Sequence, residues 1–195
     1  MVKQREKKVG NTILFVVDAS GSMGVNHRMA QVKATVLSLL ADAYRKRDRV
    51  GVITFRREGA QILLPITRSV ELAQRLLEHV PTGGKTPLAK GIALARQTIL
   101  SQRARERDFL PVMVLISDGR ANAGETDHPF EEAMTEARLV AESQIRTVVV
   151  NTEQGFLRLG LAEQLAHTME AQMLTMEELA NGTLMKTYDN RRKDR

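Results

Sequence analysis

The chain has 195 residues, of which 43% are apolar and 27% charged, so it is long enough to bury one full-sized core. It contains no Cys and no Trp, and only 4% of its residues are aromatic. These values exclude disulfide scaffolds, Cys-ligated zinc, iron–sulfur clusters and thiol nucleophiles, and they disfavour base-stacking or carbohydrate-stacking surfaces. We expect a single domain in a cytoplasmic setting, since a chain without Cys suits a reducing compartment.

The formal net charge of +6 is confined to the two ends of the chain. Residues 1–8 and 186–195 each carry a net charge of +3, whereas residues 9–185 are neutral. We interpret these ends as solvated tails, and nucleic-acid binding by them is the less favoured alternative. No run of 18 apolar residues exists and the first ten residues are charged, so we expect neither a membrane span nor a signal peptide.

The first half of the chain alternates apolar runs with amphipathic stretches. Residues 12–17 (TILFVV) have the continuous β-branched and apolar character of a strand buried on both faces. Residues 28–44 repeat apolar side chains at helical spacing, and residues 49–55 predict the next strand. The connection to a strand at 60–64 is too short for a crossover helix, so this pair should be antiparallel, with Pro65 ending an edge strand.

Further along, helices and strands continue to alternate. Ser69 is a predicted N-cap for a helix that ends near Val80, and Pro87 opens the next helix, which extends to about Ser101. The remaining expected elements are strands at 110–116, 147–150 and 172–174 and helices at 130–143, 161–169 and 176–185. This rhythm predicts an α/β fold: an open, mainly parallel six-stranded sheet with one antiparallel edge strand and helices on both faces.

Polar residues follow two of the buried strands. Asp18, Ser20 and Ser22 stand in the loop after the first strand, Asp118 follows the strand at 110–116, and Thr86 lies in a polar loop before a helix. In open parallel sheets, ligands bind beyond the carboxyl ends of strands where the strand order reverses, so these side chains converge if the two strands are neighbours. Two carboxylates and three hydroxyls suit a hard cation, Mg²⁺ first, with Mn²⁺ or Ca²⁺ as alternatives.

Other interpretations of these residues are weaker. Gly84-Lys85-Thr86 resembles the end of a phosphate-binding P-loop, but His79 stands where that motif needs Gly. Asp18 as a phosphatase nucleophile remains an alternative, although Ser20 occupies the position where a second Asp is needed. Asp18 and Ser20 also suit a simple helix-capping turn. The four His residues have no metal-binding spacing.

Asp18, Ser20 and Ser22, then Thr86, then Asp118 resemble the metal-ion-dependent adhesion site of the von Willebrand factor A (integrin I-like) family. The resemblance implies the fold proposed above, direct metal ligation by Ser20, Ser22 and Thr86, and roles for Asp18 and Asp118 in orienting bound water and hydroxyls. It divides the chain into a basic tail or linker remnant at 1–10, the domain at 11–187 and a basic tail at 188–195.

The segments VVDASGSM, PTGGKTPLAKG and LISDGRANAG further resemble the C-terminal domain of the magnesium chelatase D subunit. That resemblance implies a protein-binding module whose Mg²⁺ is completed by an Asp or Glu of a partner, an AAA+ ATPase subunit, in the pathway to magnesium porphyrins and chlorophyll. No catalysis is expected from the domain itself, only membership of an ATP-dependent ligase that forms nitrogen–metal bonds. We expect either an excised domain or a free-standing relative serving another AAA+ system, with metal-dependent phosphohydrolysis as the least favoured alternative.

Overall fold

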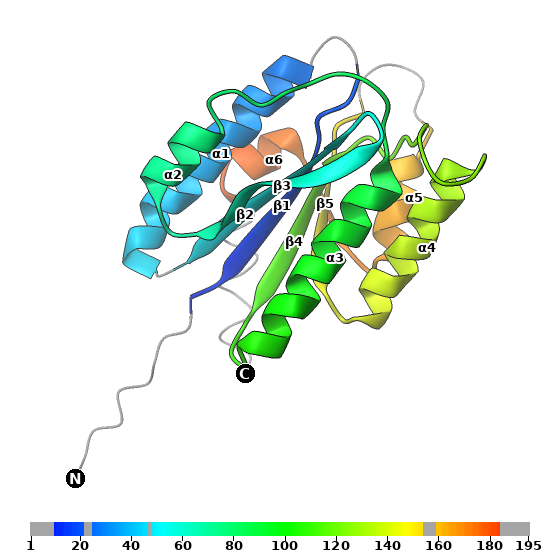
Figure 1. The fold of residues 1–195 in the computed structure, drawn as a ribbon. Helices are drawn as coiled ribbons and strands as arrows, with labels where there is room; N and C mark the ends of the chain where they lie inside the picture. The colour runs from blue at the N-terminus through cyan, green and yellow to red at the C-terminus, as the bar shows by residue number, and fades with distance from the viewer. Residues whose placement is uncertain (1–9, 22–24, 47, 154–158, 184–195) are drawn as a thin grey trace.

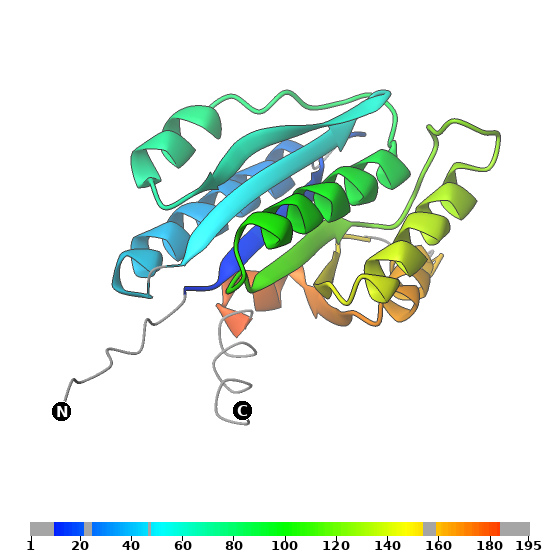
Figure 2. The ribbon, with the colours of Figure 1, turned by 60° about the horizontal axis from the view of Figure 1, so that its bottom comes forward.

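The computed structural model describes residues 10–21, 25–46, 48–153 and 159–183. A central six-stranded sheet lies between two layers of helices (Figures 1 and 2), which confirms the expected fold class. The elements in chain order are β1 (Thr12–Asp18), α1 (Val25–Lys46), β2 (Arg49–Arg56), β3 (Gly59–Thr67), α2 (Val70–Leu76), α3 (Leu88–Arg105), β4 (Pro111–Ser117), α4 (Pro129–Glu142), β5 (Arg146–Asn151), α5 (Leu161–Thr168), β6 (Gln172–Thr175) and α6 (Met176–Ala180). Within these described residues no helix is long and apolar enough to cross a bilayer.

The strand order is β3-β2-β1-β4-β5-β6, and every neighbouring pair is parallel except β2 and β3. The chain therefore builds the sheet outward from β1 in one direction and then returns to β4 to build it in the other. The order reverses between β1 and β4, where Val17 pairs with Ile116. This switch point is the place where open α/β sheets bind their ligands.

The two faces of the sheet carry separate cores because alternate side chains of a strand point to opposite faces. In β1, Phe15 and Val17 pack in the core covered by α1, α2 and α6. Leu14 and Val16 pack in the core covered by α3, α4 and α5. All seven residues of β1 and all seven of β4 are buried, as their continuous apolar sequences predicted.

Several predicted boundaries were wrong. Two helices are longer than predicted, since α1 begins at Val25 and α3 extends to Arg105. β3 does not end at Pro65 but continues to Thr67, with an irregular register opposite Val50 and Val52. It is an edge strand, where a residue without an N–H is tolerated. The helix capped by Ser69, which accepts a 3.0 Å hydrogen bond from the Leu72 N–H, ends at Leu76 rather than Val80. The backbone leaves helical geometry at Leu77, whose φ and ψ are −91° and 0°.

The last helix is shorter than predicted. It ends at Ala180, because Gly182 adopts a left-handed φ of 75° that terminates helices. The final part of the helix predicted at 176–185 lies beyond residue 183, outside the described residues.

Candidate metal site

The first candidate residue, Asp18, closes β1 at the switch point and is almost fully buried, with 3% of its surface exposed. Its Oδ1 accepts a 2.9 Å hydrogen bond from the Ser20 backbone N–H and a second one from the Ser20 hydroxyl. The turn after β1 therefore folds back on its own carboxylate, which fixes the Ser20 side chain over the end of the strand.

Thr86 joins this pair from a distant loop. Its Oγ1 lies 2.6 Å from Ser20 Oγ, and Thr86 and Ser20 are 6% and 4% exposed. Two backbone hydrogen bonds hold the loops together: the Gly21 N–H donates to Gly84 O at 3.1 Å and the Gly83 N–H donates to Ala19 O at 2.8 Å. The two loops are far apart in sequence, but their backbones are hydrogen-bonded to each other beyond the carboxyl end of β1. This pairing brings the two hydroxyls together.

Asp118 follows β4 directly and lies on the other side of the switch point. Its Oδ1 accepts a 2.9 Å hydrogen bond from the Arg120 N–H, and its side chain is 25% exposed. The next residue, Gly119, has φ of 81°, and a Cβ there would lie 2.5 Å from the backbone N of Ala162 at the start of α5. Only glycine fits this turn, so helix packing sets where the Asp118 carboxylate emerges.

The electrostatics of the site favour an added cation. Burial raises the pKa of Asp18 and outweighs both hydrogen bonds from Ser20 and the positive charge of Arg28; the nearby Asp118 charge raises it further. The fold therefore holds a carboxylate in a place that disfavours its negative charge. A divalent cation beside Asp18 would stabilise that charge, which is the effect expected of a metal site.

The donor set fits Mg²⁺. Buried oxygens of Asp18, Ser20 and Thr86 converge, and hard cations prefer oxygen ligands. Across the described part of the chain, no group of three or more His, Asp or Glu side chains is placed to hold a metal ion, so a metal at this site would depend on the hydroxyl oxygens. The fifth candidate, Ser22, lies outside the described residues.

Sequence reasoning missed Asn122, which holds Thr86 in place. The Thr86 N–H donates to Asn122 Oδ1 at 2.6 Å, and the Asn122 N–H donates to Thr86 O at 3.2 Å. Asn122 lies in the segment after β4, so it ties the Thr86 loop to the strand that carries Asp118. No local motif identifies this contact, because it joins residues 36 positions apart.

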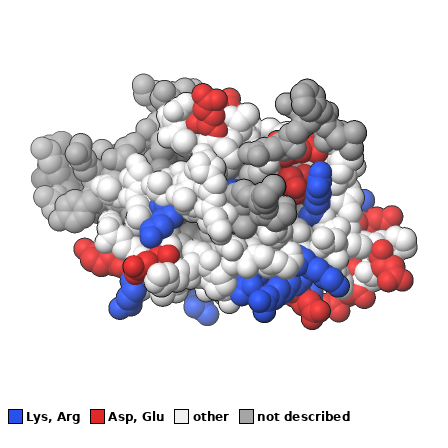
Figure 3. Space-filling model, turned by 90° about the horizontal axis from the view of Figure 1, so that it is seen from above, with Lys and Arg blue, Asp and Glu red and all other residues white. Residues whose placement is uncertain are grey.

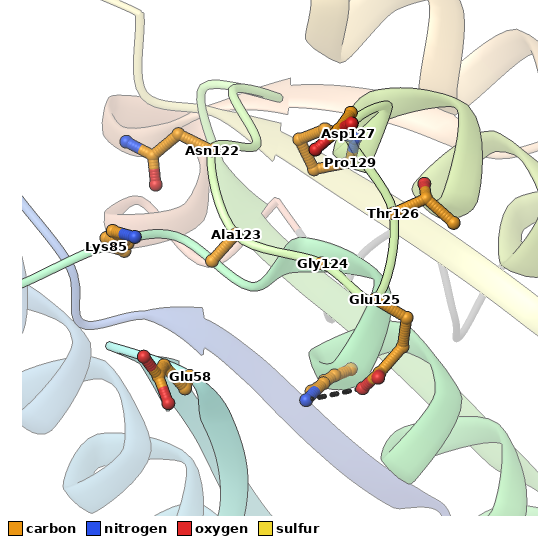
Figure 4. A pocket seen from close by; sticks show the side chains of 10 residues that line it. Glu58, Lys85, Asn122, Ala123, Gly124, Glu125, Thr126, Asp127 and Pro129 are labelled. Carbon is orange, nitrogen blue, oxygen red and sulfur yellow. Dashed lines mark ion pairs between the residues drawn. The ribbon is translucent and has the colours of Figure 1, made fainter.

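A polar cavity of about 570 Å³ opens beside Asn122. Figure 4 shows Glu58, Lys85 and Asn122 around one end of the cavity and the ion pair between Lys90 and Glu125, 2.8 Å long, at another. The cavity therefore adjoins the loop that presents Thr86.

Comparison with known families decides the affiliation of the chain. Residues 13–120 match the von Willebrand factor type A domain. The chain belongs to this family. Its matched region begins in β1 and ends just past Asp118, so it contains every candidate ligand.

Several curated relatives resemble this von Willebrand factor A domain over most of its length. An uncharacterized protein of Mycobacterium tuberculosis is 46% identical over 90% of the chain, and an uncharacterized protein of Methanocaldococcus jannaschii is 34% identical over 84%. The magnesium-chelatase 67 kDa subunit of Heliobacterium mobile is 38% identical over 95% of the chain. The chain spans 28% of the mycobacterial protein, 94% of the archaeal one and 29% of the chelatase subunit.

Solved structures agree on the fold. The von Willebrand factor domain of the type V pili tip protein Mfa5 from Porphyromonas gingivalis superposes with a TM-score of 0.72 at 13% identity, covering 93% of this chain and 96% of that one. The protein BatB from Bacteroides thetaiotaomicron superposes with a TM-score of 0.66 at 19% identity, covering 92% and 100%. At such low identity these likenesses concern the fold alone.

Proposed function

We propose that this domain is a metal-ion-dependent protein-binding module that holds Mg²⁺ at Asp18, Ser20, Ser22, Thr86 and Asp118. The observation that carries the proposal is the contact between the Ser20 and Thr86 hydroxyls, 2.6 Å apart above the buried Asp18 carboxylate. Ser20 and Thr86 would bind the metal directly together with Ser22. Asp18, through its hydrogen bonds with Ser20, and Asp118 would orient hydroxyls and bound water.

The charge of this ligand set explains why a partner would bind. Hydroxyl ligands are neutral, so Mg²⁺ held by them keeps much of its positive charge and accepts one more oxygen ligand. A carboxylate is the oxygen ligand of opposite charge, so the partner would supply an Asp or Glu side chain. The proposal assigns no catalysis to the domain itself.

The relatives support one class of partner. The chain is 38% identical over 95% of its length to a magnesium-chelatase subunit, which supports a place in a chelatase-like assembly. As the family resemblance implies, the domain would there couple an AAA+ ATPase to the metal-inserting subunit. A free-standing domain serving another AAA+ system is the second candidate. It is favoured by the archaeal relative, 94% of whose length matches this chain.

Metal-dependent thermal stability tests the site. A ligand that binds the folded state at 100 times its Kd stabilises it by about 2.7 kcal/mol. For a domain of this size the Tm should therefore rise by roughly 5–10 °C in saturating Mg²⁺. Asp18→Ala and Thr86→Val should abolish this rise, whereas Thr98→Val, which removes a hydroxyl bonded to Leu94 O within α3, should retain it.

A Mg²⁺-dependent rise that persists in Asp18→Ala and Thr86→Val would contradict the proposed site. Binding of a purified AAA+ ATPase subunit of a magnesium chelatase then tests the partner. The interaction should require Mg²⁺ and the same two residues. Mg²⁺-dependent stabilisation without such binding would favour the second candidate.

A further inference from the structure

Two exposed cationic residues lie at the loop that presents Thr86: Arg57 packs against the loop and Lys85 belongs to it. Arg57 stands in the two-residue turn between β2 and β3, and its N–H donates to Lys85 O at 2.7 Å. Lys85 immediately precedes Thr86, and both Arg57 and Lys85 are exposed. Arg56, at the end of β2, adds a third positive charge to this edge. We call Arg56, Arg57 and Lys85 the basic rim.

The backbone at Arg57 is unusual for an arginine. Its φ is 57°, in the left-handed region that favours glycine and asparagine. The first position of such hairpin turns is usually glycine, so the turn would form more easily without this side chain. A charged residue at a strained position points to a role for the side chain outside the turn itself.

Gly84 provides the space that Arg57 occupies. A Cβ at Gly84 would lie 2.6 Å from Arg57 Cγ, so the arginine stem packs across a residue with no side chain. Gly84 also accepts the hydrogen bond from Gly21 that joins the two metal-site loops. The Arg57 stem is therefore held directly over these loops.

The positive charge of the rim has little internal compensation. Lys90 is neutralised by Glu125 across the cavity, at 2.8 Å, but among the described residues Arg56, Arg57 and Lys85 form no ion pair. Glu58 is the one carboxylate within the rim's own turn and lies at the same end of the cavity as Lys85 (Figure 4). In the view of Figure 3, Lys and Arg side chains lie in several places on the surface, interspersed with Asp and Glu.

We propose that the basic rim binds a second acidic side chain of the partner, close in sequence to the carboxylate that completes the metal site. This inference rests on the proposed function and narrows the partner to an acidic peptide segment rather than a lone Asp or Glu. Arg57 and Lys85 form ion pairs with the second acidic residue, and the cavity beside Asn122 leaves room for its side chain. Since the ion pairs are exposed, they add selectivity more than affinity.

Two synthetic peptides test the rim. Both contain one central Asp between Gly and Ser residues, and one of them carries two Glu directly after the Asp. Their Kd values are measured by NMR titration of the isotope-labelled chain in 5 mM Mg²⁺ and in EDTA. We expect both peptides to require Mg²⁺ and the acidic one to bind about tenfold more tightly at low salt, because each exposed ion pair contributes a factor of roughly 2 to 5. At 1 M NaCl, where the Debye length is about 3 Å, the preference should largely disappear.

Variants separate the rim from the metal site. Arg57→Gly should fold with an unchanged or raised Tm, because glycine suits the left-handed backbone. It should keep the Mg²⁺ affinity but lose most of the preference for the peptide that carries two Glu. Arg57→Lys should keep the preference. Arg107→Gln removes an exposed arginine just before β4, at the opposite end of the sheet, and is the matched control that should change nothing.

The outcomes distinguish the two proposals. If neither peptide responds to Mg²⁺, the proposed function fails. If both bind with Mg²⁺ but equally tightly, or if the Arg57→Gly, Lys85→Gln double variant keeps the preference, the metal site stands and the basic rim is refuted.

Discussion

Asn122, in the segment after β4, is hydrogen-bonded to the candidate metal ligand Thr86. Replacing Asn122 with Ala tests whether this contact positions Thr86. The Asn122 side chain accepts a 2.6 Å hydrogen bond from the Thr86 N–H, and Thr86 is only 6% exposed. Removing the acceptor leaves a buried N–H without a partner, which costs about 1–3 kcal/mol. A domain of this size loses roughly 2–4 °C of Tm per kcal/mol, so the Tm should fall by about 2–12 °C.

The same variant should weaken Mg²⁺ binding. Mutation of a residue that orients a metal ligand typically weakens metal binding 10- to 100-fold. The Kd for Mg²⁺, measured by calorimetric titration, should therefore rise by that factor. Asn122→Asp keeps the acceptor and should restore most of the Tm. Gln97→Ala, which removes an exposed amide on α3, is the matched control and should shift the Tm by less than about 2 °C. An Asn122→Ala protein with wild-type Tm and Mg²⁺ affinity would refute the reasoning.

Three further predictions concern the site and its scaffold. Asp18→Asn should raise the Tm in EDTA yet abolish the Mg²⁺-dependent rise, because burial raises the pKa of Asp18 and so penalises its charged form at neutral pH; a lower Tm in EDTA would contradict this. Arg49 holds the pKa of Glu106 below its ordinary value of 4.5 through two 3.0 Å hydrogen bonds, so the stability from this pair is present above pH 4.5 and is lost as the pH falls through the lowered pKa. Glu106→Gln should therefore unfold at lower urea concentration at pH 7 and lose less on acidification, and parallel pH profiles would argue against the pair. Gly91→Ala should cost about 1–3 kcal/mol in urea denaturation, because its Cβ would lie 2.4 Å from the Phe55 ring; an unchanged midpoint would show that the ring moves aside.

The sheet and the convergence of the site were largely predictable from sequence. Continuous apolar runs identified β1 and β4 as buried strands, and each ends at a polar turn. The rule that ligands bind where the strand order reverses then brought Asp18 and Asp118 to one edge, and β1 and β4 are neighbours. Thr86 was added to this group from its polar loop and then matched the family pattern, and its hydrogen bond to Ser20 shows that the two loops meet.

The contacts that hold the site were not predictable, because they depend on how loops meet in space. Asn122 and Arg57 belong to no local motif, and each acts through a backbone contact with the loop that presents Thr86. The same limit explains Pro65, which local propensity treats as a strand end. Only the position of β3 at the sheet edge, with its irregular register against β2, explains why the strand continues.

The hydrogen bonds within the candidate site suggest how metal binding and partner binding would be linked. Ser20 donates to Asp18 and contacts Thr86, so these buried hydroxyls have hydrogen-bond partners within the protein. A bound metal would therefore have to replace these contacts rather than fill a set of unsatisfied groups. Metal affinity should then be moderate, and a partner carboxylate that completes the coordination would strengthen it by the same factor by which the metal strengthens partner binding.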